Sequence, residues 1–189
     1  MPTIKKQICL LRHARYCSRG FTLLEVMVAL VVMSVGLLSL AGMQVIGLRT
    51  NHSAYMRTQA TIQSYDIIDR MRANIIGVRD GYYDKPTVAG SDGIEHTACE
   101  STTGCSTQHM AEHDLFKWNQ AIADVLPDGQ GVVCVDSTPE DGTPGAGAGA
   151  SACDGIGSAN PLMAMYTIKI WWSDDQSGNP QRFSTSFRP

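Results

Sequence analysis

The stretch that decides the fold runs from residue 19 to residue 48 and reads RGFTLLEVMVALVVMSVGLLSLAGMQVIGL. Residues Val26 to Leu48 carry no charge and are rich in Val, Leu, Met and Ala. About 20 such residues cross a bilayer as a helix. The one charge inside the apolar segment is Glu25, four positions after Phe21. We therefore predict a membrane-spanning helix over residues 21–48.

The charges on either side of this segment are unequal. Residues 1–20 hold five basic residues and no acid, whereas the rest of the chain holds ten basic residues and all 18 acids. Basic flanks stay in the cytoplasm, so everything after Leu48 should be exported. The acidic body offers no general attraction for phosphates, which argues against a basic nucleic-acid-binding protein.

An ordinary secretory signal is the alternative for this region. Ser39-Leu40-Ala41 has the form of a signal-peptidase site, with cleavage before Gly42. The apolar core of such a signal runs about 7–15 residues. Here the core is longer and contains a carboxylate, so a retained helix is favoured.

The helical pattern continues beyond the apolar segment. No proline occurs between Phe21 and Lys85, and one helix is expected from Phe21 to Ile76. Residues 49–78 should form its amphipathic half. The expected buried stripe consists of apolar-to-neutral residues at spacings of three and four: Ala54, Thr58, Thr61, Tyr65, Ile68, Met71 and Ile75.

Residues 79–189 read as an exported head. Residues 77–113 are rich in Gly, Ser, Thr and Asp and predict a long irregular connection. Asp114 is the expected cap of a short helix over Leu115 to Leu126, which Pro127 then ends.

Alternation of apolar and polar residues predicts strands at 132–135, 163–172 and 181–187, with a flexible Gly-Ala tract at 142–151. The fold class is therefore α+β, a long N-terminal helix packed on a small antiparallel sheet. Trp171 and Trp172 should point to opposite faces of the sheet, one into the core and the other half-exposed.

Four cysteines lie in the exported part, where disulfides persist, and they allow three pairings. We predict the pairs Cys99–Cys105 and Cys134–Cys153, because each closes a local loop. Zinc binding by the thiolates is disfavoured by their spacing.

The segment from His109 to His113 fits the pattern H-x-x-E-H of some zinc peptidases. On a helix both histidines could face a metal, with Glu112 as the general base. The segment lies in a polar connection, so surface histidines are the simpler interpretation, and no metal is assigned.

An acidic loop is the other candidate for ion binding, with carboxylates that could gather calcium: Asp136, Glu140, Asp141 and Asp154. A solvated loop is the favoured interpretation. No phosphate-binding loop is found. We expect no enzyme, catalytic residue or cofactor.

Arg19 to Glu25, followed by the apolar run, resembles the processing site of type IV prepilins and type II secretion pseudopilins. The resemblance implies that a prepilin peptidase cuts between Gly20 and Phe21, methylates Phe21 and removes a leader, residues 1–20, that includes Cys9 and Cys17. It also implies that Glu25 docks against the terminal amine of a neighbouring subunit. Snorkelling of Glu25 to the headgroups is the alternative.

Three further stretches, 26–79, 114–131 and 166–172, are similar to minor pilins of the PilV type. This similarity implies a single-pass protein of the inner membrane with a periplasmic head, which then joins the pilus. Its partners would be major and minor pilins, contacted through the N-terminal helix, and the inner-membrane assembly platform. A minor pseudopilin, an anchored adhesin or DNA-uptake subunit, and a secreted zinc peptidase are the alternatives.

Overall fold

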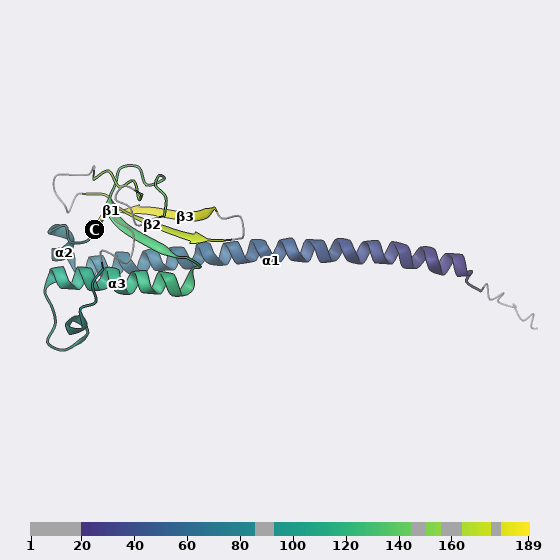
Figure 1. The fold of residues 1–189 in the computed structure, drawn as a ribbon, viewed down its shortest axis with the longest axis horizontal. Coiled ribbons are helices and arrows are strands. Elements are labelled where there is room, and N and C mark those ends of the chain that lie inside the picture. Colours follow the sequence, from purple (N-terminus) through teal and green to yellow (C-terminus); the bar gives the residue numbers. More distant parts are fainter. Residues whose placement is uncertain (1–19, 86–92, 145–149, 156–163, 175–178) are drawn as a thin grey trace, which may run out of the picture. The chain divides into compact units, whose positions relative to one another are not determined.

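The computed structural model of the protein describes residues 20–85, 93–144, 150–155, 164–174 and 179–189. The long helix α1 (Leu23–Ala73) begins in a first unit that ends at Gly47 and finishes in a second unit that begins at Leu48. The second unit contains the remaining elements: α2 (Ile75–Arg79), the 3-10 helix η1 (Thr97–Glu100), α3 (Thr107–Val125), β1 (Gln130–Val135), β2 (Tyr166–Ser173) and β3 (Pro180–Phe187) (Figure 1). The leader up to residue 19 and residues 145–149 of the Gly-Ala tract lie outside the described residues.

The part of α1 in the first unit exposes its side chains on every side, from Leu23 to Gly47. Among the described residues, α1 is the one helix that is long and apolar enough to cross a membrane, by length and composition. A helix that is apolar all round is stable only where lipid or other helices surround it. This part of the structure indicates membrane anchoring.

The second unit is built on an antiparallel sheet with the strand order β1-β2-β3. Ile168 of β2 faces Val133 of β1 and Thr185 of β3. Alternate residues of β2 join the main core: Tyr166, Ile168, Ile170 and Trp172. The observed helices and sheet confirm the predicted α+β class.

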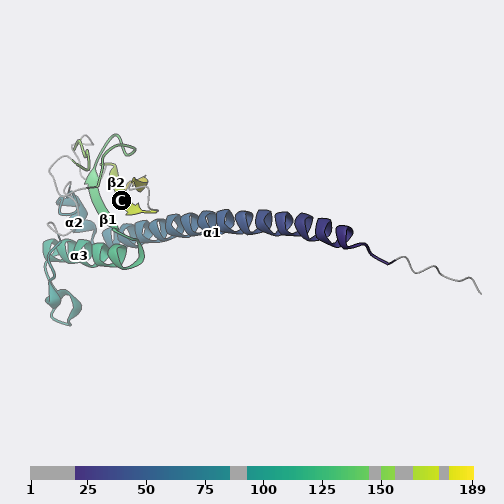
Figure 2. The ribbon, with the colours of Figure 1, turned by 45° about the vertical axis from the view of Figure 1, so that its right-hand side comes forward.

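The main core lies between the sheet and two helices, α3 and the end of α1, which run side by side (Figures 1 and 2). The Trp118 indole on α3 donates a hydrogen bond to the Gln63 carbonyl on α1, at 2.8 Å. Strand β1 approaches α3 closely at Gly131, where a Cβ would lie 2.5 Å from both Trp118 and Ile122. Glycine is required there because any side chain would push the strand away from the helix.

The buried face of α1 differs from the predicted stripe. The buried residues are Met56, Ala60, Ser64, Ile67, Ile68 and Met71, so only Ile68 and Met71 of the prediction are buried in α1. Tyr65 is 63% exposed. The two stripes are adjacent and similar in polarity. The observed stripe is the one whose apolar residues join the main core with α3 and the sheet.

The ends of two helices also correct the prediction. Helix α1 stops at Ala73 because the Asn74 side chain caps α2 by accepting a hydrogen bond from the Gly77 amide, at 3.2 Å. Helix α3 begins at Thr107, well before Leu115, because Ser106 caps it by accepting from the His109 amide, at 3.2 Å. Asp114 is thus a buried residue inside α3 and caps nothing.

The two adjacent tryptophans of β2 do point to opposite faces, since they belong to different core clusters. The expectation that one is half-exposed is wrong, because Trp171 and Trp172 are each 1% exposed. Trp171 packs with Val132 and Cys134 under the segment that leaves β1 and returns through Cys153. We call its described residues, 136–144 and 150–155, the covering segment. The second face of the sheet is therefore covered.

Candidate functional site

The described part of the processing motif, from Gly20 to Glu25, lies where the chain enters α1. Gly20, Phe21 and Thr22 are exposed and non-helical, and the helix begins at Leu23. Thr22 caps the helix, because its Oγ1 accepts a hydrogen bond from the amide of Glu25, at 3.3 Å. A threonine followed three positions later by a glutamate is a common way to start a helix. The Gly20–Phe21 bond thus lies in accessible chain just outside the first helical turn.

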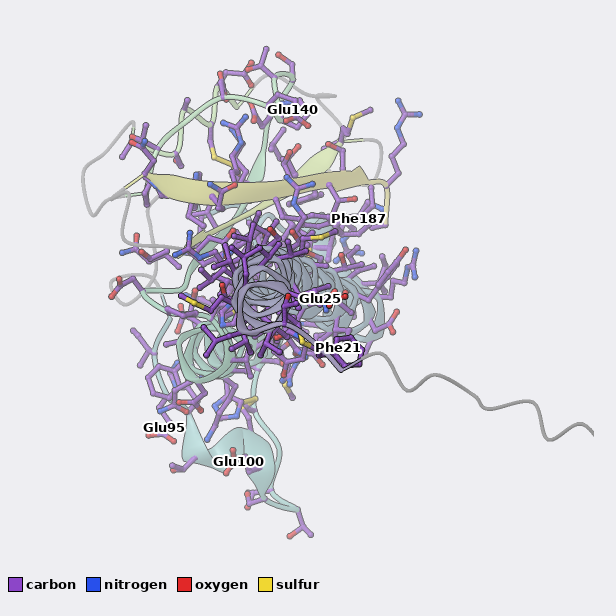
Figure 3. All side chains as sticks on the ribbon, turned by 90° about the vertical axis from the view of Figure 1, so that its right-hand side faces the viewer. Phe21, Glu25, Glu95, Glu100, Glu140 and Phe187 are labelled. Atoms are coloured by element: carbon purple, nitrogen blue, oxygen red, sulfur yellow. A yellow bond between two sulfur atoms is a disulfide. The ribbon has the colours of Figure 1, made fainter. Side chains whose placement is uncertain are left out.

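Glu25 lies in the first turn of α1, where a negative charge interacts favourably with the helix dipole. Figure 3 shows Glu25 and Phe21 close together at this end of the helix. The hollow beside them is otherwise apolar, and its lining residues are Phe21, Glu25, Val26, Ala29, Leu30 and Met33. Within the described part of the chain, no side chain or backbone group is bonded to the Glu25 carboxylate. A carboxylate in an apolar segment is costly unless it has a partner.

Among the described residues, Cys99 is bonded to Cys105 and Cys134 to Cys153, the pairs expected from the sequence. The first ties η1 to the start of α3 across six positions. The second joins β1 to the end of the covering segment, 19 positions later. Each bond closes one connection of the head upon itself.

The acidic loop of the covering segment is solvated only in part: Glu140 and Asp154 are exposed, whereas Asp136 is buried beside a lysine. The ammonium of Lys169 lies 2.7 Å from carboxylate oxygens of both Asp136 and Asp141. Lys169 and Asp136 are completely buried. Glu140 instead pairs with Arg182, and Figure 3 shows it on the outer side of the sheet. The hydrogen bond from Lys169 lowers the pKa of Asp141.

A second polar network joins the helices. The Tyr83 hydroxyl donates to Asp114 at 2.5 Å and accepts from the Asn74 amide at 3.2 Å. Arg70 of α1 lies 3.5 Å from the same Asp114 carboxylate. Burial and the hydrogen bond to Asp114 raise the pKa of Tyr83 far above its usual value. Asp114, predicted as a cap, instead connects three segments of the head.

The H-x-x-E-H segment lies on the first turns of α3 and not in an irregular connection. His113 is buried, accepting from the His96 amide at Nδ1 (3.1 Å) and meeting Glu100 at Nε2 (3.3 Å). His109 and Glu112 instead gather with His96, from the segment before η1. The arrangement expected of a peptidase, with both motif histidines facing one ion, is therefore not formed.

Sequence reasoning missed His96 and Lys169. His96 lies 13 positions before His109 and belongs to no motif, so only the fold could bring the two together. Lys169 did carry a signal, because a lysine in the middle of an otherwise apolar strand needs a buried acidic partner.

Comparison with protein families finds the prokaryotic N-terminal methylation motif, which matches residues 15–41. A search of curated proteins found no match. A search of solved structures also found none.

The methylation motif indicates a type IV pilin-like or pseudopilin-like protein, a structural class and not an enzymatic one. It implies processing by a prepilin peptidase and assembly with other pilins. The matched residues include both the exposed Gly20–Phe21 bond and the apolar first part of α1. The motif and the apolar helix together indicate membrane anchoring and a place in a pilus.

Proposed function

We propose that the chain is a minor type IV pilin of the PilV type, matured by cleavage between Gly20 and Phe21 and by N-methylation of Phe21. The observation that carries the proposal is the methylation motif at the entry to a membrane-length helix. Cleavage at this bond removes residues 1–20 and leaves the helix in the protein. Accessible, non-helical chain on both sides of the bond suits a peptidase substrate.

Cleavage also supplies the partner that Glu25 lacks. It turns the Phe21 amide nitrogen into an amine, a cation at the edge of an apolar environment. A lone carboxylate there is costly, and a lone ammonium is too, but the two compensate each other when paired. We propose that Glu25 of one subunit pairs with the Phe21 amine of its neighbour during fibre assembly.

The remaining contact surface would be α1 itself. Its apolar side chains are exposed through the first unit, and exposed apolar residues continue in the second with Tyr55, Ile62 and Tyr65. Helices of neighbouring pilins would cover these side chains in a fibre. The periplasmic head would then help to initiate or cap the pilus, or would alter its surface.

The first test is the intact mass and N-terminal residue of the membrane-extracted protein. We expect a chain that begins at methylated Phe21 and contains two disulfides. Gly20→Val should abolish this processing because a branched side chain then precedes the scissile bond. Gly36→Val is the matched control, since Gly36 also has open space around it but lies inside the helix. A wild-type chain that begins at Gly42 would refute the proposal.

The role of Glu25 is tested with Glu25→Gln, which keeps the shape of the side chain and removes its charge. We expect normal membrane insertion and normal processing but no subunit in sheared pili. Assembly of the variant at the wild-type level would refute the pairing while leaving the processing step intact.

A minor pseudopilin of type II secretion is the second candidate, because the same methylation motif fits it. Deletion of the gene separates the two candidates. Loss of twitching with normal secretion supports the pilin, and the reverse supports the pseudopilin.

A further inference from the structure

Three potential metal ligands meet on the surface of the head. They are His96, His109 and Glu112, and their ligand atoms all lie within 4.8 Å of one another. His109 and Glu112 are one turn apart on α3, while His96 comes from the segment that precedes η1. The group therefore joins two elements that are adjacent only in the folded head.

The backbone around His96 is held from several directions. Its amide donates to Nδ1 of His113 at 3.1 Å, and its carbonyl accepts from the amide of Cys99 at 2.9 Å. Cys99 is in turn bonded to Cys105, directly before the Ser106 cap of α3. His96 is thus already held in place without a ligand, so binding costs little additional conformational entropy.

The two residues of α3 are positioned in complementary ways. Gln108 donates to Glu112 Oε1 at 3.0 Å, which orients the carboxylate and leaves Oε2 directed at Nε2 of His96, 2.7 Å away. The His109 ring stacks on the His96 ring, with centroids 4.2 Å apart and planes 13° from parallel. His109 is exposed, so its side chain can turn toward an ion without disturbing the core.

We propose that His96, His109 and Glu112 bind one divalent first-row transition-metal ion, with Zn²⁺ as the ion to test. Imidazole nitrogen and carboxylate oxygen are ligands that this class of ion prefers. Zinc–ligand bonds of about 2.0–2.2 Å require the ligand atoms to lie about 3.3 Å apart. The three ligand atoms lie within 4.8 Å of one another, so small side-chain rotations bring them to this distance. Water from the exposed side fills the remaining position. This proposal is independent of the pilin assignment.

The ion would hold the segment around η1 against the first turns of α3, on the side of the head opposite Glu140 (Figure 3). In this site Glu112 is a ligand and not a general base, and His113 is occupied by the His96 amide and by Glu100. The proposed site therefore keeps two residues of the H-x-x-E-H pattern and replaces the third with His96.

The test is calorimetric titration of Zn²⁺ into the full-length processed protein in detergent, purified without a polyhistidine tag and stripped with a chelator. We expect one ion per chain and a higher melting temperature when the ion is bound. His109→Ala is the decisive variant because an exposed residue can be removed without unfolding the head. It should weaken binding at least tenfold and abolish the thermal shift, and His96→Ala should do the same.

His52→Ala is the matched control, since His52 is an exposed histidine on α1 that lies outside the group. It should bind zinc as the wild type does. The proposal is overturned if the wild type binds no zinc. It is also overturned if His109→Ala, shown to be folded by its tryptophan fluorescence, binds as tightly as the wild type. Loss of binding in His52→Ala alone would place the ion elsewhere and would equally overturn it.

Discussion

Replacing Lys169 with methionine should destabilise the head strongly. Lys169 and Asp136 are both completely buried, with the ammonium 2.7 Å from Asp136 Oδ2. Among the described residues no other group compensates that oxygen, which lacks a well-aligned hydrogen bond. Lys169→Met therefore leaves a buried carboxylate without its counterion.

Removing one partner of a buried ion pair costs about 3–5 kcal/mol of folding free energy. Since about 1.4 kcal/mol is a factor of ten, the ratio of folded to unfolded protein should fall more than a hundredfold. Asp141 adds little to this cost, because its side chain is 46% exposed and can turn to water. The double variant Lys169→Met/Asp136→Asn removes the stranded charge and should recover more than half of the loss.

The assay is urea unfolding in detergent at neutral pH, followed by tryptophan fluorescence. All three tryptophans lie in the second unit, so the signal reports on the head. Arg72→Met is the matched control, because it removes an exposed ion pair with Asp69 and should cost less than about 1 kcal/mol. A cost for Lys169→Met as small as that of the control, or a double variant no more stable than the single one, would refute this reasoning.

Three further predictions concern the other polar contacts and the disulfides. Tyr83→Phe removes the hydrogen bond to buried Asp114 and should cost about 1.5–3 kcal/mol of folding free energy in the same urea assay. Because the pKa of Tyr83 is raised in the folded protein, wild-type stability should also fall as the pH rises above the ordinary tyrosine value of 10.0. Replacing Cys134 and Cys153 with serine should cost about 3 kcal/mol of folding free energy, against about 2 kcal/mol for Cys99 and Cys105. The reason is that closing the longer loop removes more entropy from the unfolded chain. An equal loss of stability in the two variants would count against this account. The hydrogen bond from Lys169 lowers the pKa of Asp141 below its ordinary value of 3.8. The stabilisation by ionised Asp141 should therefore be complete above pH 3.8 and should be lost as the pH falls through the lowered pKa. In urea unfolding, the difference in stability between wild type and Asp141→Asn should shrink over this acid range.

Much of the fold could be predicted because its signals are local. The apolar run of residues 26–48, the alternation in β2 and β3 and the face formed by Leu115, Trp118 and Ile122 all follow from spacing alone. The buried side of α1 could not be predicted in this way. It depends on which stripe meets the sheet and α3, and two adjacent stripes had similar polarity.

The candidate sites also differ in whether their signals are local in the sequence. Gly20, Phe21 and Glu25 form a contiguous motif, and each disulfide closes a short loop, so the printed sequence is enough to suggest them. His96 reaches His109 only through the path of the chain around η1, and Asp136 reaches Lys169 only through the return of β2 along β1. Asp114 is a good helix cap by type, but Ser106 is an equally good one and caps the helix eight positions earlier.

The segment that covers the outer face of the sheet has two sides with different tasks. Asp136 and Ser151 are buried and hold the segment down through Lys169, whereas Ser137, Thr138 and Thr143 face water. The Ser137 and Thr138 hydroxyls bond to carboxylates of the segment itself, so exposed Thr143 is the position of the three where a substitution leaves the anchors untouched. The same layout makes this segment a natural place to display a foreign peptide, provided that the lysine, its aspartate and the Cys134–Cys153 bond are kept.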